Sequence, residues 1–254
     1  MGLEICVDSV ASAFAAEAGG AERIELCSAL IEGGLTPGPG LLRAVCSQLR
    51  IGVHVMIRPR GGDFLYTAEE LTVMRYDIEE AARWGAAGVV LGVLTAAGEV
   101  DVARTRELVN LARPMKVTFH RAIDLTRDVQ QSLGAVIETG AAFVLTSGGE
   151  QTVIQGQGQI RRMVEAANGQ IRVMAGGGVR PDNVEGLIAA TGVSDIHAAL
   201  RTAIPSQMAF RTQKVQLGDA GSDSYDRTEV RVEDVKILRQ AMDRCVSTRA
   251  KSQI

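Results

Sequence analysis

Short β-branched runs that end abruptly in polar residues recur along this chain, and the stretch VHVMIRPRGGDF at residues 53–64 is the clearest of them. An apolar run suits a strand buried on both faces, and the arginines, glycines and aspartate that follow suit the place where it leaves the core. The same change occurs in EICVDS (4–9), RIELCS (23–28), VTFHRA (117–122), FVLTSGG (143–149) and VMAGGGV (173–179). Polar residues at the ends of successive strands predict a barrel with a functional site at one end.

Strand-like and helix-like segments alternate along the whole chain. Strands are predicted at 3–7, 23–27, 53–57, 87–91, 115–120, 142–146, 171–175 and 194–198. Helices are predicted after each of them, at 9–18, 38–49, 68–84, 102–112, 128–139, 157–167, 181–190 and 231–245. Eight such units in 254 residues predict a single-domain (β/α)₈ TIM barrel in the α/β class. An open doubly wound sheet is the alternative, but the GxGxxG sequence that marks its first turn is missing.

We expect one domain over residues 1–254, with a barrel core at about 1–201, an irregular loop at 202–228 and a final helix at 231–245. So long a connection is unusual inside a barrel, and a lid, an oligomer contact and a surface excursion all remain open. Its middle is expected to be mobile because small residues gather there, namely Gly218, Gly221, Ser222 and Ser224.

Two local signals mark helix starts. Thr67, followed by Glu70 three residues later, fits a capping box. Thr36 followed by Pro37 fits a cap and a first-turn proline. We expect one helix to begin at each of these places.

Charge and composition exclude several function classes. The formal net charge is −3 and the chain has no basic stripe, so no nucleic-acid partner is expected. The start of the chain lacks the pattern of a signal peptide. The longest apolar stretch, at 86–97, is interrupted by two glycines and is shorter than the roughly 20 residues that cross a bilayer. We therefore expect no membrane partner and a cytoplasmic location.

The four cysteines are Cys6, Cys27, Cys46 and Cys245, and none forms a CxxC pair or a zinc-type spacing. In a chain of this length they indicate reduced thiols rather than a disulfide framework.

Side chains in a strand alternate between two faces, which predicts what lines the barrel. In the first strand Leu3, Ile5 and Val7 share the apolar face, which must meet the helices. The opposite faces therefore point inward, and they carry Glu4, Cys6, Glu25, Cys27, Met56, Arg58, His120, Met174 and His197. Buried charges need partners, and Arg58 is the expected counter-charge to Glu4 and Glu25. A structural ion network and a ligand pocket both explain such an interior, and we favour the pocket.

Seven segments together resemble the CutC family, namely LEICVDS, RIELCS, EGGLTPG, MIRPRGGDF, VTFHRAID, VLTSGG and the GGGV turn. They run in family-like order and spacing from Leu3 to about Arg211. The resemblance implies a TIM barrel, a cytoplasmic location, homo-oligomers and a role in copper handling. It implies that Cys6 and Cys27 are copper ligands. It also implies a pocket formed by Glu25, Arg58, Arg60, Asp63, His120, Arg121 and His197.

The chain departs from the family after the last strand. Where the family carries a small polar pair, this sequence reads His197-Ala198-Ala199-Leu200. Chemistry that needs a hydroxyl or thiol there is not expected in this protein.

Copper binding is the first function that the inward-facing residues suggest. Cu(I) prefers thiolate and thioether ligands, and the alternation places Cys6 and Cys27 on adjacent strands, close enough to share one ion. Met56 or Met174 could supplement them. The alternative is that both cysteines are small buried hydrophobic residues. Cys46 and Cys245 are interpreted as structural.

An enzyme for a small anionic substrate, such as a phosphorylated one, is the second hypothesis, as an isomerase, lyase or hydrolase. His120 and Glu25 are candidates for acid–base catalysis, with Arg58 as the third catalytic candidate. Anion-binding candidates are Arg58, Arg60, Asp63, Arg121, Ser147, Gly176, Gly177, Gly178 and His197. A non-catalytic scaffold is the third hypothesis, but no helix face indicates a partner.

Overall fold

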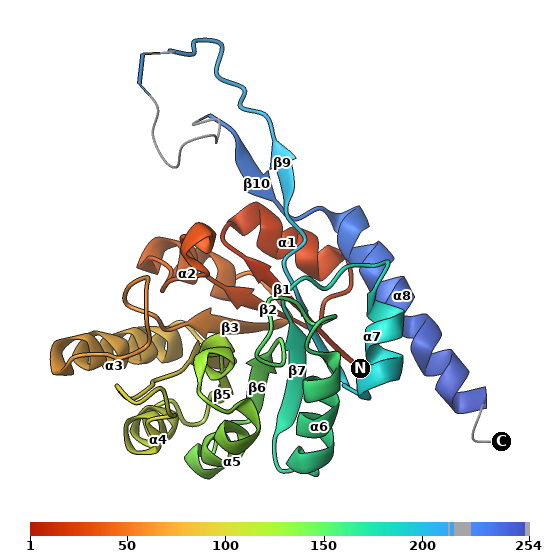
Figure 1. Ribbon diagram of the computed structural model, residues 1–254. Coiled ribbons are helices and arrows are strands. Elements are labelled where there is room, and N and C mark those ends of the chain that lie inside the picture. Colours follow the sequence, from red (N-terminus) through yellow and green to blue (C-terminus); the bar gives the residue numbers. More distant parts are fainter. Residues whose placement is uncertain (213, 216–224, 252–254) are drawn as a thin grey trace.

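Eight parallel strands form a closed barrel in chain order in the computed structural model of this protein (Figure 1). The structure describes residues 1–212, 214–215 and 225–251, the last six as backbone only. β1 pairs with both β2 and β8, which closes the sheet. The strands are β1 (Gly2–Val7), β2 (Arg23–Leu26), β3 (Gly52–Met56), β4 (Gly88–Leu91), β5 (Lys116–Phe119), β6 (Phe143–Thr146), β7 (Arg172–Gly176) and β8 (Asp195–Ala198). The predicted TIM barrel is confirmed.

Helices surround the barrel, and α8 packs against α7 and α1 to close the outer ring (Figure 1). They are α1 (Val10–Ala18), α2 (Pro39–Cys46), α3 (Ala68–Arg83), α4 (Val102–Leu111), α5 (Val129–Thr139), α6 (Gln157–Ala167), α7 (Val184–Thr191) and α8 (Val232–Lys251). Two 3-10 helices, η1 (Leu30–Glu32) and η2 (Arg121–Leu125), follow β2 and β5. No described helix is long and apolar enough to cross a membrane.

The two predicted helix starts have different outcomes. Thr67 and Glu70 form the capping box at the start of α3. The prediction for α2 is wrong by two residues, because Gly38 is its N-cap and Pro39 lies in its first turn. Thr36 instead pairs with the chain after β3: its hydroxyl accepts a hydrogen bond of 2.9 Å from the backbone N–H of Arg58.

The predicted strand faces are confirmed. Leu3, Ile5 and Val7 belong to the main core, which fills the space between the sheet and the helices. A second, small apolar cluster lies inside the barrel and consists of Cys6, Cys27, Met56 and Val90. The interior is therefore only partly apolar, which is unusual because barrel interiors are mostly filled by Val, Ile and Leu.

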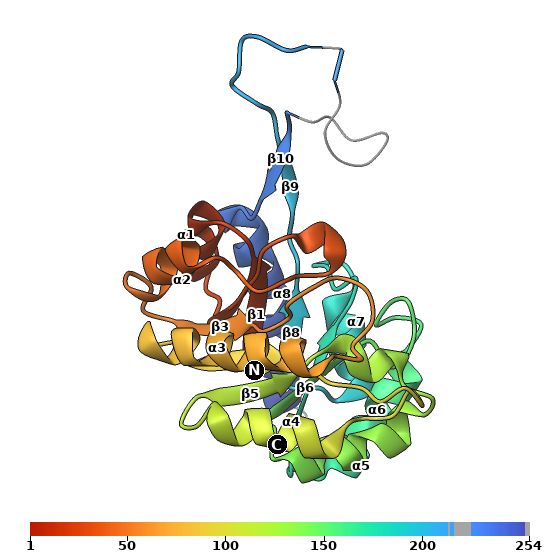
Figure 2. The same ribbon diagram turned by 90° about the vertical axis from the view of Figure 1, so that its left-hand side faces the viewer.

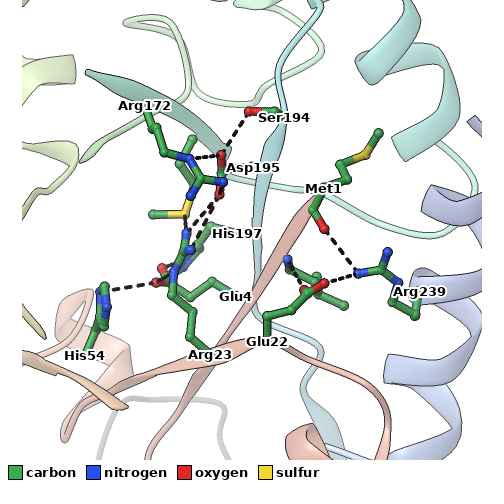
Figure 3. A network of polar contacts seen from close by, with 12 residues as sticks. Met1, Glu4, Glu22, Arg23, His54, Arg172, Ser194, Asp195, His197 and Arg239 are labelled. Carbon is green, nitrogen blue, oxygen red and sulfur yellow. Dashed lines mark hydrogen bonds and ion pairs between the residues drawn. The ribbon is translucent and has the colours of Figure 1, made fainter. Parts of the chain in front are cut away.

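A buried ion network fills the barrel interior near the amino-terminal ends of the strands (Figure 3). Glu4 accepts a 2.6 Å hydrogen bond from Arg23 Nε and lies 2.8 Å from His197 Nδ1. Arg23 also approaches Asp195 at 3.4 Å, and Asp195 pairs with Arg172 at 2.7 Å. This network closes the amino-terminal end of the barrel. The structural ion network therefore occupies that end, and the ligand pocket can only lie toward the carboxyl ends of the strands.

The expected pairing of Arg58 with Glu4 and Glu25 is wrong. Arg58 Nη1 donates to the carbonyls of Glu32 and Gly34 over 2.5 and 3.1 Å, and its Nη2 donates to the carbonyl of Gly62 over 2.9 Å. Arg58 lies just after β3 and reaches across to loops, whereas Arg23 lies within β2 beside Glu4.

The segment between the barrel and α8 forms an arm that projects from the barrel (Figures 1 and 2). Its base is an antiparallel ribbon of β9 (Thr202–Ile204) and β10 (Arg227–Glu229), where the sequence predicted only an irregular loop. The predicted mobile residues Gly218, Gly221, Ser222 and Ser224 lie outside the described residues.

Candidate functional site

A cavity of about 320 Å³ opens at the carboxyl ends of the strands, where barrel enzymes bind their ligands. It is lined by residues of β1, β2, β3, β6 and β8 and by the segments that follow β2, β3, β5, β7 and β8. All three predicted catalytic candidates line it, namely Glu25, Arg58 and His120. Other predicted residues at its wall are Cys6, Arg121, Gly177, Gly178 and His197.

Two cysteine sulfurs meet at the floor of this cavity. Cys6 Sγ on β1 lies 3.9 Å from Cys27 Sγ, just after β2. Cys6 lines the cavity, and Cys27 lies behind it with no solvent exposure. We call these two residues the sulfur pair. Cys27 Sγ also donates to Glu25 Oε2 over 3.4 Å, so two sulfurs and a carboxyl group lie within reach of one ion.

A glycine turn covers the sulfur pair. Gly34 has a φ of +95°, and a Cβ atom placed on it would lie 3.0 Å from Cys27 Sγ. Only glycine adopts this backbone without strain and leaves room for the thiol. The turn is held because Ser28 and Leu35 exchange backbone hydrogen bonds on either side of it. The EGGLTPG segment therefore shapes the floor of the cavity.

The groups around the sulfur pair strongly perturb one another. The hydrogen bond between Cys6 and Cys27, together with the neighbouring His197, lowers the pKa of Cys6 to about 5 despite burial. The same hydrogen bond, together with burial, raises the pKa of Cys27 well above its ordinary value. Burial and the negative Cys6 sulfur raise the pKa of Glu25. Of the two thiols, Cys6 is therefore the one that is ionised at neutral pH.

His197 connects the sulfur pair to the buried ion network. Burial alone would lower its pKa, but the carboxyl group of Glu25 and the contacts with Cys6 and Glu4 raise it well above its usual value. Burial would likewise raise the pKa of Glu4, but the hydrogen bond with His197 and the charge of Arg23 lower it to about 2. A charged imidazole thus lies between a carboxylate and a thiolate.

His120 and Arg58 form the opposite wall, and Phe64 fixes both. The Phe64 ring lies 4.7 Å from the His120 ring and 4.9 Å from the Arg58 guanidinium. Burial and the charge of Arg58 lower the pKa of His120 to about 3, so this imidazole is neutral.

Arg121 reaches the cavity from η2 and is held by residues that do not line it. Its Nε donates to Asp124 over 2.8 Å, and its Nη2 donates to Ser147 Oγ over 2.7 Å. Ser147, a predicted anion-binding residue, has no solvent exposure and also donates to Asp124. Its hydroxyl therefore orients Arg121 instead of facing the cavity.

Three other predicted residues also lie away from the cavity wall. Arg60 pairs with Glu70 at 2.6 Å and with Asp63 at 3.0 Å, so Arg60 and Asp63 form a surface cluster with the start of α3. Gly176 lies within β7, where a Cβ atom would come within 2.6 Å of Leu145 Cδ1 and 3.1 Å of the His197 side chain. Its role is to leave room for these two neighbours.

Sequence reasoning missed several residues at the wall. Arg180 and Arg201 line the cavity from the loops after β7 and β8, and Leu30 and Phe64 complete it. The two arginines follow polar strand ends, which is the signal that could have identified them. Arg23 lies two residues before Glu25 on the same strand. The alternation of strand faces therefore also predicts that Arg23 points into the barrel.

A comparison with protein families now assigns this barrel. A model described as the CutC family matches residues 1–202. This chain belongs to the CutC family. The family model covers all eight barrel strands and therefore every residue of the cavity.

Named relatives agree with this assignment. The chain is 48% identical over 95% of its length to a family protein CutC from Chromobacterium violaceum, of which the match covers 98%. It is 44% identical over 93% of its length to the human copper homeostasis protein cutC homolog, of which the match covers 86%. The crystal structure of a putative copper homeostasis protein CutC from Streptococcus agalactiae superimposes with a TM-score of 0.74 at 31% identity, covering 78% of this chain and 97% of that chain.

The cavity of this CutC protein contains the two alanines that replace the small polar pair of the family. Ala198 and Ala199 both line the cavity beside His197. Methyl groups occupy the positions where a hydroxyl or thiol would offer a ligand, so polar contacts at this wall come from His197 and from the arginines.

Proposed function

We propose that this protein captures Cu(I) between Cys6 and Cys27 and acts in copper homeostasis. The observation that carries this proposal is the 3.9 Å separation of the two sulfurs at the floor of an open cavity. Soft sulfur ligands select Cu(I), and the relatives named as copper homeostasis proteins support a copper cargo.

The sulfur separation fits a shared ion. At a metal–sulfur bond of about 2.3 Å, the value for zinc thiolates, two sulfurs are about 4.0 Å apart at an angle of 120° and about 4.6 Å apart in a linear arrangement. The observed 3.9 Å is close to the first value, which leaves room for a third ligand. Glu25 is the nearest candidate, because one of its carboxyl oxygens lies in the same cluster of possible metal ligands as both sulfurs.

The surroundings also favour Cu(I). Met56 and Val90 pack against the sulfur pair, so the thiols lie in an apolar environment. The Cys6 thiolate is ready to bind at neutral pH, and Cys27 releases its proton when the metal enters.

A competition titration tests this function. The protein is mixed anaerobically with Cu(I) and a chromogenic Cu(I) chelator, and we expect one Cu(I) per chain to leave the chelator. Cys6→Ser and Cys27→Ser should each weaken binding by roughly 100-fold or more, because even outer-shell changes cost 10–100-fold. Cys46→Ser and Cys245→Ser are the matched controls, and should bind as the parent protein does. Equal binding by all four variants would overturn the proposal.

We also propose that the protein is cytoplasmic and forms homo-oligomers. The four free cysteines support a reducing compartment. Exposed apolar side chains on the arm, above all Phe210, support contact with a second copy.

The sequence also indicated an enzyme for a small anion. The arginines at the cavity wall favour that class of ligand, and they lie beside the sulfur pair without competing for it. The two hypotheses therefore share one cavity and Glu25, whereas the sulfurs belong to the copper site and the arginines to the anion site.

A further inference from the structure

The cavity wall above the sulfur pair carries buried polar atoms that have no partner. Within the described part of the chain, Arg58 Nε, His120 Nε2 and Glu25 Oε1 make no hydrogen bond. All three residues line the cavity and are at most 6% exposed. Native structures leave few buried polar atoms unpaired, so such a group of them indicates a ligand.

Two of these atoms are hydrogen-bond donors, which decides the polarity of the ligand. His120 Nδ1 accepts a hydrogen bond from the backbone N–H of Ala122, so the neutral imidazole carries its proton on Nε2. Arg58 Nε always carries a proton, because a guanidinium group is not deprotonated in proteins. Cu(I) at the sulfur pair satisfies neither donor, because a cation accepts no hydrogen bond. The missing partner therefore carries acceptor oxygens.

The charge at the wall identifies the ligand as an anion. Four arginines line the cavity, namely Arg58, Arg121, Arg180 and Arg201. Glu25 is the only carboxyl group among the lining residues, and its Oε2 is already engaged by the Cys27 thiol at 3.4 Å. Asp124 pairs with Arg121, but the arginines outnumber the acidic groups at the wall, which leaves an excess of positive charge.

The loops after β7 and β8 supply unused donors on one side of the cavity. Neither the Arg180 nor the Arg201 side chain forms a hydrogen bond or a close ion pair with a described residue, and Arg201 interacts only through its charge, with Asp8. The backbone N–H groups of Gly178 and Val179 also have no acceptor among the described residues. Gly177 and Gly178 have φ values of +116° and +78°, which makes this turn available only to glycine. The loops after strands seven and eight frequently form the phosphate site of a TIM barrel.

We propose that this cavity binds a small phosphate ester. The amides of Gly178 and Val179 and the side chains of Arg180 and Arg201 hold the phosphoryl group. Arg58 Nε and His120 Nε2 donate to oxygen atoms of the organic part. A cavity of about 320 Å³ lies at the small end of the range for ligand sites, so the ester is a small metabolite. This site is independent of the sulfur pair.

The proposed phosphoryl-binding half of the site is tested by titration with inorganic phosphate, and binding is measured by ³¹P NMR. We expect one saturable site that Arg180→Ala and Arg201→Ala each weaken about tenfold or more, since each removes a charged hydrogen bond. Both side chains are exposed, so both variants should fold. Arg161→Ala is the matched control, because Arg161 lies on α6 and pairs with Glu165 at the surface. Absence of phosphate binding, or equal binding by all variants, would overturn this half.

The organic half is tested with a panel of sugar and polyol phosphates of three to six carbons. We expect at least one ester to bind about tenfold or more tightly than inorganic phosphate, and the same polyol without phosphate to show no binding. His120→Ala should remove the advantage of that ester and leave inorganic phosphate binding unchanged, whereas His120→Gln, which keeps an N–H donor, should restore part of it. An ester advantage that survives His120→Ala, or no advantage for any ester, would overturn this half.

Two further comparisons separate the proposals. Citrate and malonate should bind more weakly than inorganic phosphate, and equal binding would contradict the assignment to phosphate. The double variant Cys6→Ser/Cys27→Ser should lose Cu(I) and keep phosphate binding, so failure of the copper proposal and failure of this one are distinguishable. Loss of phosphate binding in a folded double variant would contradict the independence of the two sites.

Discussion

Arg23 Nε donates a 2.6 Å hydrogen bond to Glu4 Oε2 in the barrel interior, where Glu4 has no solvent exposure. A buried ion pair contributes little net stability when it is intact, but removal of one partner leaves the other charge uncompensated. We predict that Glu4→Gln lowers the free energy of unfolding by about 3–5 kcal/mol, as measured in urea. Glu165→Gln, which breaks the exposed pair with Arg161, should change it by less than about 1 kcal/mol.

The same residue predicts a pH dependence. The pKa of Glu4 is about 2 in the folded protein and 4.5 by reference, so its carboxylate stabilises the fold fully above about pH 4.5. This stabilisation, about 3 kcal/mol at most, is lost as the pH falls from about 4.5 to about 2. The stability difference between the parent protein and Glu4→Gln should therefore shrink across that window. A difference that stays constant down to pH 2 would show that Glu4 is not held ionised.

Gly34 should control the position of Cys27. We predict that Gly34→Ala weakens Cu(I) binding about tenfold or more, because the new Cβ would lie 3.0 Å from Cys27 Sγ and the thiol must move. Gly20→Ala is the matched control, since Gly20 has the same φ of +95° but a Cβ there meets only Arg239 Cγ at 3.5 Å. Both variants should lose about 1–2 kcal/mol of stability from the left-handed backbone. Unchanged Cu(I) affinity in Gly34→Ala would disprove the role of this turn.

The arm predicts the assembly state. Met208 and Phe210 are 59% and 75% exposed on a segment that projects from the barrel. We expect sedimentation to give a mass above the 26.9 kDa of one chain, and Met208→Ser/Phe210→Ser to return it to that of a monomer with unchanged circular dichroism. A monomeric parent protein, or an oligomer that survives the double change, would contradict this prediction.

Much of the fold was predictable because strands alternate strictly between two faces. Cys6 and Glu25 were placed inside the barrel from residue parity alone, and the register of β1 and β2 pairs the two. The alternation identifies the two faces because both faces of a barrel strand are buried, and one is apolar whereas the other carries polar and sulfur-containing side chains.

The loops were less predictable, because hydrogen bonds distant in sequence decide where their side chains lie. Arg58 was expected to neutralise inward acids, yet it binds carbonyl groups of the loops that follow β2 and β3. Arg60, only two residues later, turns toward Glu70 at the start of α3 and leaves the cavity. The directions of these two arginine side chains depend on glycine turns. The backbone angles of such turns cannot be predicted from the pattern of apolar residues.

The role of Thr36 shows the same limit. Followed by proline, it looked like a helix cap, but its hydroxyl accepts the backbone N–H of Arg58 instead. The capping box of Thr67 was predictable because both of its partners lie within four residues of sequence. Local contacts could be predicted from sequence, whereas contacts between loops required the structure.

The most direct test of the copper proposal is an anomalous diffraction map recorded at the copper edge from crystals loaded anaerobically with one equivalent of Cu(I). We predict a single strong peak between Cys6 Sγ and Cys27 Sγ, about 2.3 Å from each sulfur. A map without a peak there, or with its main peak at Cys46 or Cys245, would contradict it.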